Sequence, residues 1–381
     1  MKIYLISPID IKYSFRATER YVYEYADYLR RHGKEVEILV TRRKIKSKKL
    51  NNNDLIRKYK KIKQRFIDCR EFLLPLKWHL FIYKDLPRDG IIYFPYSIYD
   101  YLYEILFKPK GQKYIIGSHS MHLKNGRMIE NHQLLESALN SLVNLVLWLR
   151  RGEIKNIYIH AINTAQVEYI RQNFKLIKEE NIFHIPNMVN AEKYRTAKNK
   201  SNKLRVVHIG GTDKDIHSVF SIIKLLKEDG HINDFEFYFI GKISERVDLE
   251  LMKMPNLHFL GEIGEKSKLK ILSAMDAIIV PAYETFSMVV LEGLASGLYV
   301  LTSKKNAAWR DFKELGIKLF VAENGQPVEY IKALENLAAV KKIGKNANTY
   351  ADYNKNIVIK NFGESIVLKK ILGMFEYTEH I

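Results

Sequence analysis

Short apolar runs alternate along the chain with segments in which apolar residues recur at helical spacing. A predicted helix, Ala17–Arg31, has Val22, Tyr25 and Leu29 on one face. Strands are predicted on either side of it and beyond, at Lys2–Ser7, Glu35–Thr41, Ile91–Phe94, Lys113–Ile116, Ile157–Ala161 and Asn181–Ile185. This alternation is typical of mainly parallel sheets covered by helices.

A second series of the same kind follows a polar stretch, residues 187–202, which loses apolar periodicity as linkers do. Helices are predicted at Asp215–Lys227, Ser267–Ala274, Ser287–Ser296 and from Val328 onward. The predicted strands are Leu204–Ile209, Glu236–Ile240, His258–Leu260, Ala277–Val280 and Tyr299–Thr302. The pattern predicts an α/β chain with two Rossmann-like doubly wound domains facing a cleft, residues 1–190 and 191–345, and terminal helices 346–381 that cross back to the first.

Composition narrows the class of protein. A chain of 381 residues with 47% hydrophobic and 12% aromatic residues is neither disordered nor fibrous, and it is long enough for two domains. The single cysteine, Cys69, excludes a disulfide framework within the chain and a zinc site built from cysteines.

Two observations bear on location. The opening MKIYLISPID is too short and wrongly flanked for a signal peptide, and the apolar run Leu139–Leu149 is shorter than the about 20 residues of a membrane-spanning helix. We therefore expect a cytoplasmic protein, either free or peripheral on the inner face of the membrane.

The net charge of +19 is concentrated in one segment. Between Arg42 and Arg65, twelve basic residues stand against one acid, Asp54. This segment fits a solvated face, a nucleic-acid patch or a membrane-surface element. Apolar residues recur there at three- and four-residue spacing, which predicts an amphipathic basic helix and favours an anionic membrane surface; they are Ile56, Tyr59, Ile62, Phe66 and Cys69.

The segment from Pro281 to Glu292 holds the best candidate chemistry. A buried strand ends at Pro281 and a helix is predicted to begin near Ser287, so Glu284 lies in the loop between them. Glu292 follows eight positions later, about two helical turns, in a helix otherwise so apolar that a carboxylate needs a partner. The alternative is that Glu284 and Glu292 are two solvated surface acids without a role in binding. The amides that suit a phosphate or sugar oxygen belong to Phe286, Ser287 and Met288.

These residues resemble a known family. The Glu-x7-Glu run followed by SGLYVLTS is similar to the donor-site signature of the retaining GT-B glycosyltransferases of the glycosyl transferase group 1 type, family 4. The order of further motifs extends the resemblance over most of the chain. They are the helix and G-K-E-V ending of Ala17–Val36, the linker Ile185–Asn190, Asn256–Gly261 and Ala274–Ala277.

The resemblance implies a GT-B fold whose N-terminal domain takes the acceptor and whose C-terminal domain takes a nucleoside-diphosphate sugar. Residue by residue, it implies that Glu284 contacts the donor sugar, Glu292 the ribose and Lys214 the diphosphate. His119 matches the family histidine that faces the sugar, although a lone histidine is more often structural. Backbone contacts are implied at Gly210 and Gly211 for the phosphates and near Ile263 for the base.

The sequence also departs from the family pattern. Gly211 and Thr212 stand where the family has an arginine, and Phe15-Arg16 replaces a Gly-Gly pair. Arg16 could therefore reach a donor phosphate or an anionic acceptor, or be a surface arginine. Met188 replaces the linker glycine. Asp213-Lys-Asp215 resembles the metal motif of the other glycosyltransferase fold, but its context is wrong, and we expect neither a metal nor a cofactor.

The sequence-based hypothesis is thus a retaining, hexosyltransferase-like glycosyltransferase. It would move a sugar from a nucleotide sugar to a glycan or lipid-linked acceptor at a membrane surface. Two alternatives stay open. One is a nucleic-acid-modifying glycosyltransferase of the same fold, which the charge would suit. The other is a catalytically degenerate GT-B chain that only binds, which the missing arginine and glycines would suit.

Overall fold

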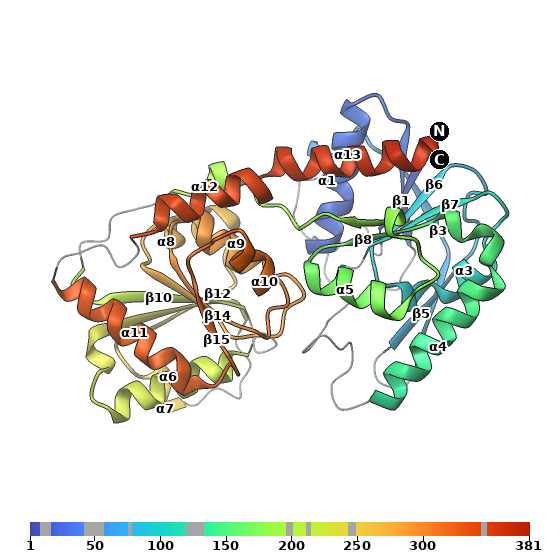
Figure 1. Ribbon diagram of the computed structural model, residues 1–381. Coiled ribbons are helices and arrows are strands. Elements are labelled where there is room, and N and C mark those ends of the chain that lie inside the picture. The colour runs from blue at the N-terminus through green and yellow to red at the C-terminus, as the bar shows by residue number, and fades with distance from the viewer. Residues whose placement is uncertain are drawn as a thin grey trace. The chain divides into compact units, whose positions relative to one another are not determined.

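The computed structural model describes residues 1–7, 17–41, 57–74, 78–117, 119, 133–195, 201–210, 215–242, 249–343 and 349–381. The chain divides into two compact units, coloured by residue number in Figure 1. Unit 1 comprises Met1–Pro186 and Leu368–Ile381, and unit 2 comprises Asn187–Val367.

Unit 1 contains, within its described residues, a parallel sheet of seven strands in the order β3-β2-β1-β6-β7-β8-β9. Its strands are β1 Ile3–Ser7, β2 Val36–Thr41, β3 Lys63–Ile67, β6 Ile91–Phe94, β7 Lys113–Gly117, β8 Ile157–Ala161 and β9 Ile182–His184. A separate antiparallel hairpin pairs β4 Cys69–Leu74 with β5 Trp78–Tyr83. The strand order reverses between β1 and β6, which is the switch point of a doubly wound sheet.

Helices flank this sheet (Figure 1). They are α1 Ala17–Arg31, α3 Leu102–Leu106, α4 Gln133–Leu149, α5 Thr164–Asn173 and, from Leu368 on, the end of α13 Glu364–His380. The end of α13 is held by Lys113, whose Nζ donates to the carbonyls of Thr378 at 2.6 Å and Glu379 at 3.2 Å. A lysine in this position satisfies carbonyls that the last helical turn leaves unpaired.

Unit 2 contains, among its described residues, a parallel sheet of six strands in the order β12-β11-β10-β13-β14-β15. The strands are β10 Leu204–Ile209, β11 Phe235–Ile240, β12 Leu257–Gly261, β13 Ala277–Val280, β14 Tyr299–Ser303 and β15 Phe320–Ala322. Its helices are α6 Ile216–Glu228, α7 Leu249–Met252, α8 Glu265–Leu272, α9 Met288–Ala295, α10 Trp309–Glu314, α11 Pro327–Lys342 and α12 Ala351–Phe362. This order places the switch point between β10 and β13.

The central strands are buried on both faces, and their composition explains why. Every residue of β1, β6, β8 and β13 is buried. Parallel strands covered by helices on both sides must be almost continuously apolar, and this is the pattern from which the strands were predicted. The predicted fold class, two doubly wound parallel sheets, is confirmed.

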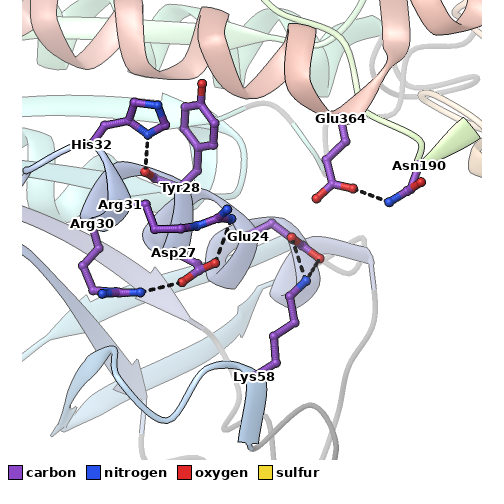
Figure 2. Close-up of polar contacts among 9 residues, drawn as sticks. All are labelled: Glu24, Asp27, Tyr28, Arg30, Arg31, His32, Lys58, Asn190 and Glu364. Carbon is purple, nitrogen blue, oxygen red and sulfur yellow. Dashed lines mark hydrogen bonds and ion pairs between the residues drawn. The ribbon is translucent and has the colours of Figure 1, made fainter. Parts of the chain in front are cut away.

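The segment that begins unit 2 packs against its last helices. Val189 N donates to Phe362 O at 2.8 Å, and Asn190 Nδ2 donates to Glu364 Oε2 at 2.8 Å (Figure 2). Met188, which stands where the family has a glycine, is buried.

The predicted basic amphipathic helix is wrong for residues 59–67, whereas residues 57 and 58 are helical. Residues 42–56 lie outside the described residues, but Lys63–Ile67 is strand β3, paired in parallel with β2. Lys63 to Phe66 are exposed and Ile67 is buried. The spacing of apolar residues matched a helix by coincidence, because pairing with β2 satisfies the strand's backbone and buries Ile67.

Part of the basic charge in this segment is already paired. Lys58 Nζ lies 3.0 Å from Oε1 of the buried Glu24, as Figure 2 shows, and Arg65 Nε lies 3.5 Å from Oε1 of the buried Glu37. These contacts give two of the basic residues a role within unit 1.

Across the described segments, none of the helices combines the length and the apolar character that crossing a bilayer requires.

Candidate active site

The loop between β13 and α9 lies at the carboxyl edge of the unit 2 sheet, beside the β10–β13 switch point. Ligands of open α/β sheets bind at this position. Helix α9 begins at Met288 and Ser287 occupies its N-cap position. The helix packs so closely on the sheet that a Cβ on Gly293 would meet Ile278 Cγ2 at 2.5 Å. Tight packing on the strand places the N-terminus of α9 at the sheet edge.

Glu284 is held at this edge by its backbone. Its amide donates to Lys305 O at 3.2 Å, and its carbonyl accepts from Ala307 N at 2.8 Å, which ties the loop after β13 to the loop after β14. The side chain of Glu284 is half-buried. The carboxylate is therefore placed by main-chain bonds that a side-chain substitution would leave intact.

Glu292 is buried and has the partner that its apolar helix demanded. Lys268 Nζ on α8 lies 2.7 Å from Glu292 Oε1. The lysine offsets part of the cost of burying the carboxylate. Sequence reasoning predicted the need for a partner but did not identify Lys268, which precedes Glu292 by 24 residues.

Buried polar atoms without a protein partner mark the same edge. Within the part of the chain that the structure describes, Nε2 of His208, Oγ of Ser287 and Nδ2 of Asn306 have no hydrogen-bond partner, and all three residues are buried. They lie near the carboxyl ends of the neighbouring strands β10, β13 and β14. Such atoms are rare in folded proteins and cost stability unless a ligand or water satisfies them.

His208 is an acceptor in this group. Its Nδ1 lies 3.1 Å from Ile279 O, so Nδ1 carries the proton and Nε2 the lone pair. Burial lowers the pKa of His208 and favours the neutral ring. Sequence analysis named Ser287 but missed His208 and Asn306, whose only sequence signal is a polar residue ending or following an apolar strand.

The predicted phosphate loop is described at its two ends. Gly210 follows β10 with φ of 151°, and its amide donates to Ile240 O at 2.8 Å. Gly211 and Lys214 lie outside the described residues. Asp215 precedes α6 in the left-handed region, with φ of 57°, which is uncommon for a non-glycine residue and is often found at functional sites.

Lys305 is a cation beside this loop that sequence analysis did not name. Its Nζ lies 3.8 Å from Asp215 Oδ2 and 5.2 Å from the ring centroid of Tyr283. Lys305 thus brings positive charge from the loop after β14 to the start of α6.

The other predicted positions differ in their environment. The Phe286 ring packs against Phe312 and Phe362, with centroids 5.6 and 5.8 Å away, so only its backbone remains a candidate contact. Ile263 is half-buried in the loop between β12 and α8, and Met288 is half-buried at the start of α9. Arg16 lies outside the described residues.

His119 follows β7 in unit 1 and belongs to a hydrogen-bonded chain. Its Nε2 lies 3.0 Å from the Tyr93 hydroxyl, which lies 3.0 Å from His160 Nδ1. The Tyr21 ring stacks on the His119 ring at 5.5 Å. Sequence reasoning identified His119 and missed Tyr93 and His160, although a histidine inside the apolar strand Ile157–Ala161 is a detectable signal.

Metal binding is not indicated by the described segments, in which no group of three or more histidine, cysteine, aspartate or glutamate side chains could hold an ion. Asp213 of the Asp213-Lys-Asp215 motif lies outside them. The expectation that no metal is required stays a prediction.

A family model matches part of the chain. Residues 203–339 match the family model of the glycosyl transferases group 1, and this segment contains Glu284 and Glu292. No curated protein matches the sequence.

Solved structures share the fold over the full length. A glycosyltransferase from Rickettsia africae has a TM-score of 0.72 and 15% identity, covering 100% of this chain and 98% of its own. Anabaena Alr3699/HepE, in complex with UDP and glucose, has a TM-score of 0.67 and 13% identity, with 100% of both chains covered. The lipopolysaccharide outer core galactosyltransferase WaaB has a TM-score of 0.64 and 14% identity, with 99% of both chains covered.

The family match assigns the segment that carries the candidate site, and the solved structures share the architecture of two doubly wound units. Residues 203–339 of unit 2 therefore match the glycosyl transferases group 1, and the chain has the GT-B-like fold of two doubly wound units that these solved structures share.

Proposed function

We propose that the chain transfers a sugar from a uridine diphosphate sugar to an acceptor hydroxyl with retention of configuration. The observation that carries the proposal is a set of buried atoms at the carboxyl edge of unit 2, in His208, Ser287 and Asn306, that have no partner among the described residues. A hydroxyl of a nucleotide sugar would donate to His208 Nε2, and hydroxyl or phosphate oxygens would accept from Ser287 Oγ and Asn306 Nδ2. The UDP bound to HepE supports the choice of nucleotide.

The two glutamates would recognise the sugars of the donor. Glu284, held by its backbone at the sheet edge, accepts hydrogen bonds from hydroxyls of the transferred sugar. Glu292 accepts from the ribose hydroxyls, while Lys268 at 2.7 Å offsets the cost of its buried charge. Both contacts are charge-assisted and hence stronger than neutral hydrogen bonds.

The diphosphate would be held without a metal. The amides of Ser287 and Met288 at the start of α9 present the positive end of the helix dipole. Lys214, Lys305 and the backbone of Gly210 and Gly211 add to this, and Lys305 would compensate for the arginine that the family has in the shortened loop. Arg16 is a further cation proposed for the donor phosphate.

In the reaction, the bond between the anomeric carbon and the leaving phosphate oxygen breaks while the acceptor oxygen bonds to that carbon on the same face. The acceptor proton passes to an oxygen of the departing diphosphate. Cations and helix amides stabilise the negative charge that grows on the diphosphate. His119 would contact the transferred sugar, and no carboxylate nucleophile of the kind found in retaining hydrolases is required.

The acceptor would be a lipid-linked glycan at an anionic membrane surface, reached in the cytoplasm. The described part of the basic segment combines charge with an apolar side chain, because Phe66, which is 46% exposed, follows four exposed basic residues in the chain: Arg57, Lys60, Lys61 and Lys63. WaaB, whose name gives the lipopolysaccharide outer core, has the same fold. A nucleic-acid acceptor is the rival that the same charge favours.

The decisive experiment measures UDP release from UDP-sugars without acceptor, together with thermal shifts. We expect wild type to be stabilised by UDP and to release it slowly, and Glu284→Gln to release it about 100-fold more slowly at unchanged melting temperature. Glu314→Gln, an exposed acid on α10, is the matched control and should behave as wild type. Binding without release by wild type would instead show a degenerate binding protein.

A further inference from the structure

A chain of hydrogen bonds runs from His119 across four neighbouring strands of unit 1. It passes from His119, after β7, to Tyr93 on β6, then to His160 on β8, and ends at the carbonyl of Ile185, after β9. The last contact, His160 Nε2 to Ile185 O, measures 2.8 Å. Tyr93 and His160 are completely buried.

The buried end of the chain fixes the direction of every proton. A carbonyl only accepts, so His160 Nε2 must donate to Ile185 O. Burial lowers the pKa of His160 to about 4, so its ring is neutral and Nδ1 is an acceptor. The Tyr93 hydroxyl therefore donates to His160 Nδ1, and its oxygen is left to accept from His119 Nε2.

The opposite tautomer of His119 breaks this order. With the lone pair on Nε2, His119 and His160 would both present acceptors to the single proton of Tyr93. One of the two 3.0 Å contacts would then join two acceptors in a buried site. Of the two neutral tautomers of His119, only the one with the proton on Nε2 satisfies all three bonds.

Packing holds the same geometry. Tyr21 stacks on the His119 ring with the planes 22° apart. A Cβ on Gly117 would lie 2.7 Å from the Tyr93 hydroxyl and 3.2 Å from His119 Cδ2, so the glycine leaves the space through which the two side chains meet. The Tyr93 ring itself packs edge-on against Tyr25 at 6.1 Å.

We propose that Tyr93 and His160 are positioning residues that hold His119 as the Nε2–H tautomer. The His119 ring is thereby held in one orientation after β7. This inference rests on the proposed function for the role of His119, but the tautomer itself follows from contacts within unit 1.

The test is the tautomer of His119 in the full-length protein labelled with ¹⁵N-histidine. Two-bond ¹H–¹⁵N correlation spectra distinguish the two neutral tautomers, and the His119→Ala spectrum assigns the signals. We expect the Nε2–H form in wild type and a mixture in Tyr93→Phe. Tyr25→Phe is the matched control, because the buried Tyr25 hydroxyl has no partner among the described residues; it should leave the tautomer and turnover unchanged.

Kinetics supply the second readout. Tyr93→Phe should lower kcat about 10-fold with little change in KM, because a mispositioned contact to the reacting sugar acts mainly on the chemical step. His160→Asn, whose side-chain oxygen can accept from Tyr93, should retain more of the Nε2–H form than His160→Leu. This pair keeps the test decisive if Tyr93→Phe does not fold.

A pure Nε2–H form in folded Tyr93→Phe, or in His160→Leu, would overturn the proposal. A shifted tautomer with wild-type kcat would overturn the positioning role in transfer. Failure of the proposed function is seen separately, as full transfer activity in His119→Ala or no release of UDP by wild type, because the spectra require no activity.

Discussion

Lys268 Nζ lies 2.7 Å from Glu292 Oε1 and joins α8 to α9 beside the proposed ribose site. Glu292 is buried, whereas the lysine side chain keeps 22% of its surface exposed. The pair therefore stands between a surface ion pair, which contributes little, and a buried one, whose disruption is costly. With the ribose role proposed for Glu292, the pair would link the stability of unit 2 to the affinity for nucleotide.

Removing the lysine should therefore affect both properties. Lys268→Ala is expected to lower the free energy of unfolding by about 1–3 kcal/mol, because a buried carboxylate loses its partner, and to weaken UDP binding as Glu292 shifts. Urea unfolding and titration calorimetry measure the two effects. Lys266→Ala, an exposed neighbour on α8, is the control.

Glu292→Ala should weaken UDP binding by about 1–3 kcal/mol, because the hydrogen bonds to the ribose would be lost. Titration calorimetry with UDP measures this change. An unchanged affinity would contradict the ribose role of Glu292.

Two lysines should distinguish a nucleotide from its nucleoside. Lys214→Ala and Lys305→Ala are each expected to weaken binding of UDP while leaving binding of uridine nearly unchanged, because their ammonium groups would contact phosphate alone. The adjacent Lys304, which pairs with Glu323, provides the matched control Lys304→Ala. Calorimetry with both ligands is the measurement. Equal losses for UDP and uridine would remove either lysine from the phosphate site.

Gly293→Ala should destabilise the protein although alanine favours helices. The new Cβ would meet Ile278 Cγ2 at 2.5 Å, and overpacking of this kind costs about 1–3 kcal/mol, more than the about 0.5–1 kcal/mol that propensity returns. In an Ile278→Ala background, where that methyl is absent, the same substitution should be nearly neutral. Denaturant unfolding of wild type, the two single variants and the double variant gives the coupling free energy. A neutral single variant would mean that α9 lifts from β13 without cost.

Glu104 should make stability fall as pH rises from about 4.3 to about 7. Burial raises the pKa of Glu104 to about 7 in the folded protein. A raised carboxyl pKa means that the folded state binds the proton more tightly than the unfolded state. Its contribution is thus fully present below pH about 4.3 and is lost as pH rises through about 7.

Glu104→Gln should remove this loss. The amide oxygen can still accept the bond that Tyr83 N donates at 2.8 Å, without a charge to bury. The variant is expected to be more stable than wild type at pH 8 by on the order of 3 kcal/mol, and to be similar at pH 4.5. Urea unfolding across this pH range measures the free energy of unfolding of both proteins. Parallel curves of this free energy against pH would contradict a raised pKa of Glu104.

The exposed basic residues of the first unit should bind anionic membranes. Replacing Lys60, Lys61 and Lys63 by Gln is expected to abolish sedimentation with vesicles that contain anionic lipid, because the attraction is electrostatic and is about 1 kcal/mol per residue. The matched control replaces three exposed lysines of unit 2, Lys253, Lys266 and Lys270. Phe66→Ser should weaken binding even at low salt. If the wild-type protein does not sediment with anionic vesicles but binds duplex DNA with an affinity that falls steeply with salt, a nucleic-acid acceptor is favoured.

Local pattern was sufficient for most of the framework. The strands Ile91–Phe94, Ile157–Ala161, Leu204–Ile209 and Ala277–Val280 were predicted with the bounds that the structure has. A strand buried on both faces must be continuously apolar, so its sequence identifies it without knowledge of its neighbours. The helix Ala17–Arg31 was equally clear, because its apolar face repeats at the helical period.

Edge elements were not predictable in this way. Residues 63–67 carry one buried and four exposed positions, and the apolar residues around them fit a helix as well as a strand. Their structure is decided by the backbone pairing with β2, whose residues lie more than 20 positions earlier. A short, mostly polar segment contains no periodicity from which that partner could be inferred.

In the candidate site, too, some features were predictable from the sequence and others required the tertiary structure. The sequence determined that Glu284 and Glu292 flank a helix start, that Glu292 needs a partner, and that His119 ends a strand. Only the tertiary structure decided that the partner is Lys268, that Asn306 joins Glu284, and that His119 reaches His160 through Tyr93. The physical reason is that strand order and helix packing determine these contacts. In the β6-β7-β8 order, Tyr93 and His160 meet although they lie 67 residues apart in the chain.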